Sequence, residues 1–293
     1  MTKPGMLYAR FAIGIVAVSF GAILVRLAGD ALPLAIAAWR LALTAVVLVP
    51  LALARGTIWS IPRRELLWSM GSGVALALHF ALWIASLRYT SVASSVLFVT
   101  THPIFVGLGA HFILKERVGR GLAIGIGLAV LGGGLIGFAD LQISGGALHG
   151  DLLALAGGLA VAVYFLIGRR VRRTIPLIDY ITVTYGTAAV VVLLACLAVA
   201  CPLGGYSAQT YLFLVLLALG PQLVGHTTFN WALKHVPVSK VSVIILGEPI
   251  GSALLAVLFF GESPTWLNGV GAVIILAGIY LTLRTEEATD GED

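Results

Sequence analysis

Apolar residues run along the chain in long blocks that are separated by short segments with charged residues, glycine or proline. An apolar stretch of about 20 residues can cross a hydrocarbon core of about 30 Å as an α-helix. We therefore predict ten transmembrane helices with short connections. They are expected near residues 8–28, 32–54, 66–87, 91–113, 119–138, 151–172, 178–200, 208–233, 237–260 and 266–284.

The composition agrees with a membrane protein. Apolar residues make up 59% of the 293 positions and charged residues only 11%, whereas soluble domains average roughly 45–50% and about 25%. Water could not accommodate so much apolar surface, so the solvent of this chain must be lipid. We expect an all-α, polytopic membrane protein with no separate soluble domain.

The basic residues predict the orientation. With a cytoplasmic N-terminus, 15 of the 18 Lys and Arg lie at cytoplasmic helix ends and loops, and the outer side receives Arg26 and Arg88. The 15 are Lys3, Arg10, Arg55, Arg63, Arg64, Lys115, Arg117, Arg120, Arg169, Arg170, Arg172, Arg173, Lys234, Lys240 and Arg284. This bias is typical of an inner-membrane protein with both termini cytoplasmic. The net charge of +5 therefore does not indicate nucleic-acid binding. Residues 286–293 are expected to form an acidic cytoplasmic tail.

The chain also contains an internal repeat. The segment ASLRYTSVASSVLFVTTHPIF matches WALKHVPVSKVSVIILGEPIG at an offset of 146 residues. The aligned pairs include Leu87 with Leu233, Arg88 with Lys234, Pro103 with Pro249, Glu116 with Glu262 and Gly125 with Gly271. We predict two five-helix repeats, residues 1–145 and 146–285. Because five is odd, the repeats would cross the membrane in opposite senses, as in many secondary transporters.

Several segments resemble a known family. The runs AAWRLALTAVVLVPLALA, LRYTSVASSVLFVTTHPIFVGLGAHFILKER and GEPIGSALLAVLFFGESPTWLNGVGAVIILAGIYL resemble EamA-type members of the drug/metabolite transporter superfamily. The resemblance implies ten helices, cytoplasmic termini and transport of small organic metabolites, commonly amino-acid export. One departure is His102 before Pro103, where the family pattern has a small residue, and it leaves the substrate open.

Two predicted helices carry polar stripes. Ser72, His79 and Trp83 recur at helical spacing in the third span. Gln222, His226 and Asn230 are each four residues apart in the eighth, its counterpart in the repeat. We expect both stripes to line a substrate cavity. The alternative is that each histidine only forms a hydrogen bond to a neighbouring helix and takes no part in substrate binding.

Ionisable residues and prolines mark the same region. Arg40 lies about eight residues inside the second span and is either a carboxylate-binding group, an ion-pair partner of Glu248 or a structural anchor. Pro103 and Pro249 interrupt matching helices, which is a pointer to a transport site. Glu248 is a candidate proton carrier because a low-dielectric cavity favours a neutral carboxyl group. The alternative is a carboxylate held by Arg40 or by freed backbone groups.

Further candidates for substrate contacts are Ser19 on the first span, Thr101 and His102 on the fourth, and Tyr164 on the sixth. The sequence contains no Walker-type phosphate loop and no metal-ligand motif, so we expect no cofactor, no metal and no direct use of ATP. Cys196 and Cys201 form no disulfide framework, and a bridge between them is not expected, although Cys201 should lie near the outer face.

The sequence thus favours a secondary transporter of small amphipathic metabolites that works by alternating access, with amino acids, particularly aromatic or other large neutral ones, as the expected export substrates. A channel, an exporter of another metabolite or drug class, and remotely a membrane enzyme are the alternatives. Glycines recur at close spacing in the fifth and tenth spans and could pack within one chain or form a homodimer. We favour a monomer.

Overall fold

The computed structural model describes residues 4–90, 95, 98–116, 118–144, 148–261 and 265–284. Within these ranges the chain forms helices and no strand. An α-helix satisfies its own main-chain N–H and C=O groups, which is why long apolar segments adopt it in lipid. The expectation of an all-α protein is confirmed for the described residues. The predicted tail at 286–293 lies outside them.

In chain order the helices are α1 (Pro4–Leu27), α2 (Pro33–Arg55), η1 (Thr57–Ser60), α3 (Arg63–Ser86), α5 (His102–Phe112), α6 (Arg120–Ser144), α7 (Leu148–Val171), α8 (Leu177–Ala198), α9 (Ala208–Leu217), η2 (Ala218–His226), α10 (Thr227–Ala232), α11 (Val238–Ile245), α12 (Gly247–Phe260) and α13 (Trp266–Arg284).

Among the described residues, eight segments are long and apolar enough to cross a membrane. Two of these combine several elements: α9, η2 and α10 form Ala208–Ala232, and α11 and α12 form Val238–Phe260. A shorter apolar stretch, Arg120–Leu135, belongs to α6. The predicted span at 91–113 falls partly outside the described residues, and α5 forms its second half.

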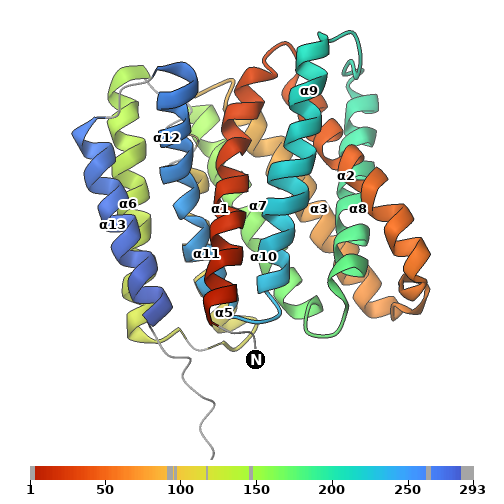
Figure 1. Ribbon diagram of the computed structural model, residues 1–293, viewed down its shortest axis with the longest axis horizontal. Coiled ribbons are helices and arrows are strands. Elements are labelled where there is room, and N and C mark those ends of the chain that lie inside the picture. The colour runs from red at the N-terminus through yellow and green to blue at the C-terminus, as the bar shows by residue number, and fades with distance from the viewer. Residues whose placement is uncertain are drawn as a thin grey trace, which may run out of the picture.

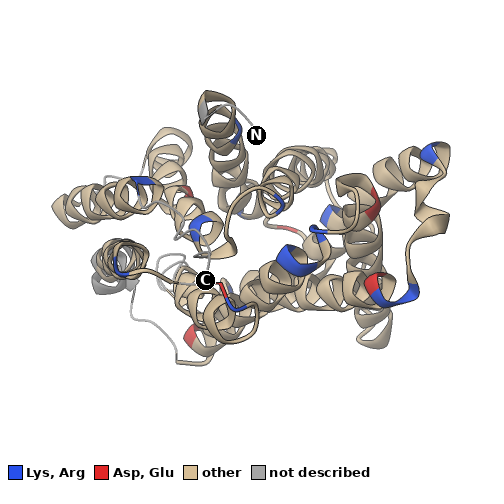
Figure 2. Cartoon of the chain, turned by 90° about the horizontal axis from the view of Figure 1, so that it is seen from below, with Lys and Arg blue, Asp and Glu red and all other residues tan. Residues whose placement is uncertain are grey.

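The long helices stand side by side and cross the molecule in alternating directions (Figure 1). We call the end at which α1 begins the N-terminal end, and α13 finishes at this same end. Figure 2 views the N-terminal end and shows Lys and Arg positions spread over several helices. The other end, where α1 finishes and α2 begins, is called the opposite end below.

Helices α6 and α13 pack against each other through glycines. A Cβ atom on Gly132 would lie 2.6 Å from the carbonyl oxygen of Gly271, and one on Gly278 would lie 2.8 Å from that of Gly125. No larger residue fits at such distances, so the close approach requires glycine. These glycines therefore pack within one chain, and whether the protein forms a homodimer stays untested.

The remaining helices surround a core rich in aromatic residues. Helix α3 packs on α7 and α8, α2 packs on α8, and α1 packs on α12 and η2. Phe80, Tyr164, Phe165, Tyr180 and Tyr185 are all buried in this core. Many leucine and valine side chains are exposed on the outside of the bundle, as expected for a surface in contact with lipid.

Candidate binding cavity

Two helix interruptions lie at the centre of the molecule. Helix α11 ends at Ile245 and α12 begins at Gly247, because Pro249 has no N–H with which to bond the carbonyl group of Ile245. Helix α5 begins at His102 with Pro103 in its first turn. Pro103 and Pro249 are a matched pair in the sequence repeat, so the same local cause breaks both segments.

A third irregularity occurs in the span Ala208–Ala232. Its middle part, η2, is a π-helix that contains Pro221. The wider π-turn accommodates the proline ring, which would collide with a carbonyl group in a regular α-helix. Gln222 and His226 both belong to this element. Such π-helical insertions are frequent at functional sites.

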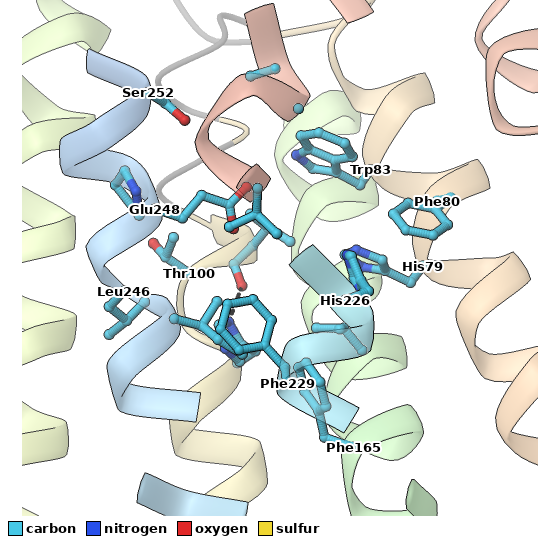
Figure 3. Close-up of a pocket in the computed structure, with 18 of the residues that line it drawn as sticks. His79, Phe80, Trp83, Thr100, Phe165, His226, Phe229, Leu246, Glu248 and Ser252 are labelled. Atoms are coloured by element: carbon cyan, nitrogen blue, oxygen red, sulfur yellow. Dashed lines mark hydrogen bonds between the residues drawn. The ribbon is translucent and has the colours of Figure 1, made fainter. Parts of the chain in front are cut away.

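A cavity lies beside these irregular segments, with about 780 Å³ of free space including the part open to solvent. Its described lining is Val18, Gly21, Ala22, Arg40, His79, Phe80, Trp83, Val99, Thr100, His102, Val161, Phe165, His226, Phe229, Ile245, Leu246, Glu248, Pro249 and Ser252. Figure 3 shows Glu248 on α12 facing the wall that carries Trp83 and His226. The lining residues come from both sequence repeats.

Arg40 is the cation of the cavity wall and is only 2% exposed. Its Nε donates a hydrogen bond to Oε1 of Gln222 at 2.8 Å. Its guanidinium carbon lies 3.9 Å from the centre of the Phe80 ring. A charge-assisted hydrogen bond and a cation–π contact together offset part of the cost of burying this charge.

Glu248 lines the cavity from the first turn of α12. The positive end of the helix dipole favours a carboxylate at this position by roughly 0.3–1 kcal/mol. Among the described residues, Glu116 forms ion pairs with Arg169 and Arg173. None of the ion pairs between described residues joins Arg40 to Glu248. Both charged groups therefore face the cavity without being paired to each other.

Two of the predicted histidines, His79 and His226, each lie beside an aromatic ring of the cavity lining. His79 Nδ1 lies 3.0 Å from the carbonyl oxygen of Gly157, and its ring is parallel to that of Trp83. His226 lies edge-on to Phe80, with ring centres 5.3 Å apart. Trp83 Nε1 and His226 Nδ1 have no hydrogen-bond partner among the described residues. A water molecule or a polar group of a ligand would supply the missing hydrogen-bond partners.

Six other predicted site residues lie outside the described cavity lining: Ser19, Thr101, Pro103, Tyr164, Gln222 and Asn230. Gln222 stands behind the wall and holds Arg40. Asn230 donates hydrogen bonds to the hydroxyl groups of Tyr164 and Tyr185. The Ser19 hydroxyl donates to the carbonyl oxygens of Ile15 and Glu248, and that of Thr101 donates to the carbonyl oxygen of Phe98.

A polar cluster connects helices at the N-terminal end. Glu116, which follows α5, accepts hydrogen bonds from Arg169 at 2.6 Å, from Arg173 at 3.0 Å and from the main-chain N–H of Val238 at 3.3 Å. Arg169 also donates to the carbonyl oxygen of Leu233. One carboxylate thus links the first repeat to two elements of the second. We call Glu116, Arg169 and Arg173 the Glu116 cluster.

At the opposite end a second pocket lies next to the cavity. Ala22 lines both pockets, and the next turns of α1 contribute Val25 and Arg26 to the outer one. Its other walls come from the start of α2 and the end of α3, where Arg88 lies. We call this pocket the vestibule. The Glu116 cluster thus connects helices at one end of the molecule, and the vestibule lies at the other.

A sequence model of the EamA-like transporter family matches residues 3–138 and again residues 148–284. The chain belongs to the EamA-like transporter family. This EamA-like chain is thus a multi-pass membrane protein of a transporter family.

Relatives of the EamA-like chain are transporters. An uncharacterized transporter of Archaeoglobus fulgidus is 26% identical and is matched over 76% of this chain and 77% of that protein. The uncharacterized transporter YyaM of Bacillus subtilis is 25% identical over 84% of this chain and 83% of its own. A probable amino-acid metabolite efflux pump of Salmonella typhimurium is 24% identical over 76% and 78%.

One solved crystal structure has the same fold as this EamA-like chain. It matches with a TM-score of 0.81, covers 95% of this chain and 96% of its own, and is 20% identical in sequence. At that identity the match supports the helical membrane fold and carries no information on the substrate.

Some residues of the EamA-like cavity escaped the sequence analysis. Phe80, Phe165, Phe229 and Ser252 line it, but an aromatic or small residue in an apolar helix gives no sequence signal of its own. Glu116 did carry a signal, because the repeat aligned it with Glu262, a residue outside the described ranges. In the described part of the chain, no three His, Cys, Asp or Glu residues are grouped as metal ligands would be.

Proposed function

We propose that this chain is a secondary carrier that exports small amphipathic metabolites, with amino acids bearing large or aromatic side chains as its substrates. It works by alternating access between two inverted five-helix repeats, residues 1–145 and 146–285. The transport family and the multi-pass membrane character are shown by the comparisons above. The substrate, the mechanism and the ten-helix inverted architecture are the proposal.

The observation that carries the proposal is the composition of the cavity. Arg40 and Glu248, contributed by different repeats, are not paired to each other and stand among Phe80, Trp83 and Phe229. An amino acid carries a carboxylate, an ammonium group and a side chain, which match these three features. Charged groups in a low-dielectric site strongly favour a ligand of complementary charge.

The two ends of the bundle support alternating access. We interpret the Glu116 cluster as the seal of the N-terminal end and the vestibule as the opening at the opposite end. The excess of Lys and Arg at the N-terminal end supports a cytoplasmic location for it by the positive-inside rule. With this proposed orientation, the structure would be an outward-facing state. A seal between cavity and cytoplasm argues for a carrier over a channel.

The internal duplication supports an inverted arrangement. The family model matches the chain twice, once in each half. The helix breaks before Pro103 and Pro249 occur at corresponding positions of the two halves. Carriers with inverted repeats bind their substrates where such broken helices meet. An exporter of drugs or of another metabolite class would have the same architecture and would differ only in its substrate.

The experiment is a transport screen in liposomes that contain only this protein. We expect exchange of aromatic and large neutral amino acids. Arg40→Gln should slow it by roughly 10- to 100-fold, because a hydrogen bond to a charged group contributes about 1.5–3 kcal/mol. Glu248→Gln should abolish accumulation driven by a pH gradient while it spares passive exchange.

Residues of the same type outside the cavity lining serve as controls. Arg64→Gln and Glu65→Gln remove charges at the start of α3, away from the cavity lining, and should leave transport unchanged. If no amino acid or related metabolite moves, the proposed substrate class is wrong. If Glu248→Gln keeps its pH dependence, Glu248 plays no part in coupling.

A further inference from the structure

The end of helix α8 brings two cysteines together. The N–H of Cys201 bonds to the carbonyl oxygen of Cys196 at 2.8 Å, and the N–H of Ala200 bonds to that of Leu197 at 3.2 Å. Ala200 has a left-handed backbone, with φ at 49°. These features define a Schellman motif, in which the first and last residues of the turn place their side chains in contact. Here both residues are cysteine.

The turn brings the side chains of Cys196 and Cys201 next to each other, and both are free thiols. Their other contacts are weak: the sulfur of Cys196 lies 3.6 Å from the carbonyl oxygen of Leu34, and that of Cys201 lies 3.9 Å from that of Pro202. A disulfide needs two Cα atoms about 4.4–6.8 Å apart with side chains that point toward each other. The closed turn brings its first and last residues close together, which is the approach that a disulfide requires.

The position of the turn sets its redox environment. It lies at the opposite end, away from the basic N-terminal end (Figure 1). In the orientation stated under Proposed function, on which this inference rests, the turn faces the outer compartment, where disulfides form and persist. We propose that Cys196 and Cys201 are joined by a disulfide in the protein as it exists in the membrane.

The oxidant is a protein disulfide of the outer compartment. The Cys201 thiolate attacks one sulfur of that disulfide, breaks its S–S bond and forms a mixed disulfide. The Cys196 thiolate then attacks the Cys201 sulfur and releases the oxidant as a dithiol. The two cysteines lose two electrons, which the oxidant gains, and their two protons pass to the oxidant's thiols. Cys201 reacts first because it is partly exposed, whereas Cys196 is buried.

The bond would fix a segment that packs on the vestibule wall. The connection from α8 to α9 accepts a hydrogen bond at Leu203 from the indole N–H of Trp39 on α2, at 2.9 Å. Pro33 and Ile36, from the first turns of the same helix, line the vestibule. The disulfide therefore fastens the chain that supports one side of the outer opening. This is a structural modification, separate from the cavity, since neither cysteine is among the described lining residues.

The test is thiol counting on the full chain in its native membrane. Membranes are denatured in the presence of N-ethylmaleimide, which blocks free thiols, and are then reduced and treated with a maleimide that carries a mass tag. We expect two tags per chain, added only after reduction. The variants Cys196→Ala and Cys201→Ala are the matched controls. Each should have its remaining thiol blocked before reduction and so receive no tag.

Two results would overturn the proposal, and they differ in meaning. If both thiols are blocked before reduction but the purified protein gains the disulfide on treatment with diamide, the turn has the right geometry and the proposed orientation is wrong. If diamide also fails to close the bond, the geometry itself is wrong. Neither result depends on the transport screen, so failure of this inference and failure of the transport proposal are distinguishable.

Discussion

A buried guanidinium group needs partners wherever water cannot reach it. Arg40 obtains them from Gln222 and Phe80, which belong to two other segments of the chain. Arg40 is also one of the residues that line the cavity. These contacts agree with a structural anchor, and a role of Arg40 in binding a carboxylate stays a prediction.

Asp30 ties the connection between α1 and α2 to the start of α9. It accepts hydrogen bonds from the hydroxyl group of Thr210 and from the main-chain N–H of Ser207. These bonds favour the carboxylate and hold the pKa of Asp30 below its ordinary value of 3.8. Because the folded-state pKa is the lower one, the stabilisation is complete above the ordinary pKa and is lost as the pH falls through the folded-state value.

We therefore expect Asp30→Asn to lower the unfolding temperature of the detergent-solubilised protein at pH 7. The difference from the unmodified protein should narrow as the pH falls below 3.8. Thermal unfolding followed by tryptophan fluorescence at both pH values measures this, with Glu65→Gln as the control. A difference that stays constant down to the acid range would show that the carboxylate charge does not matter.

At the scale of residues, the sequence predicted which ionisable residues line the cavity better than it predicted the partners that surround them. Arg40, His79 and Glu248 were predicted as cavity residues because polar groups in an apolar helix are costly, and all three line the cavity; their roles in transport stay predictions. The stripe of Gln222, His226 and Asn230 was expected to face the cavity as a whole. Only His226 does so, because Gln222 bonds to Arg40 and Asn230 bonds to Tyr164 and Tyr185.

Among the elements, the interrupted helices have the clearest physical origin. Proline removes one main-chain donor and collides with the preceding turn, so α12 starts anew at Gly247 and η2 widens around Pro221. The first interruption is predictable from the sequence repeat, in which Pro249 is paired with Pro103. The π-helix was not indicated by the sequence analysis, since periodicity alone does not distinguish a π-turn from a regular helical turn in a short window.

The Glu116 cluster leads to a prediction at the scale of elements. Its hydrogen bonds join the segment after α5 to α7 and to the start of α11. Glu116→Gln removes the charge that holds them, at a cost of roughly 1–3 kcal/mol, or about 5- to 150-fold in the equilibrium between the closed and open states. We expect the N-terminal end to open more often.

A cysteine at position 239 reports this opening. Ser239 is buried beside Val238 at the start of α11, so Ser239→Cys should react slowly with thiol reagents while the end is closed. In a chain that lacks Cys196 and Cys201, adding Glu116→Gln should accelerate the reaction, whereas adding Glu65→Gln should not. Equal rates in all three proteins would mean that the Glu116 cluster does not seal this end.

On the scale of the whole molecule, the chain is an assembly of helices around one polar region in an apolar solvent. The positions of the spans followed from hydropathy, because lipid permits few alternatives to a helix. The positions of the vestibule and of the Glu116 cluster could not be predicted. They depend on which side chains meet across helices, such as Glu116 with Arg169, and these contacts join residues that are far apart in the sequence.

The central claim is that the cavity between the repeats is reached from each side of the membrane in turn. The most direct measurement uses Ser252→Cys, a change in the cavity lining, in a chain without Cys196 and Cys201. A membrane-impermeant thiol reagent is applied to oriented vesicles from either face, with and without an amino-acid substrate. The account predicts labelling from both faces and protection by the substrate on both. Labelling from one face alone, whatever the substrate, would contradict it.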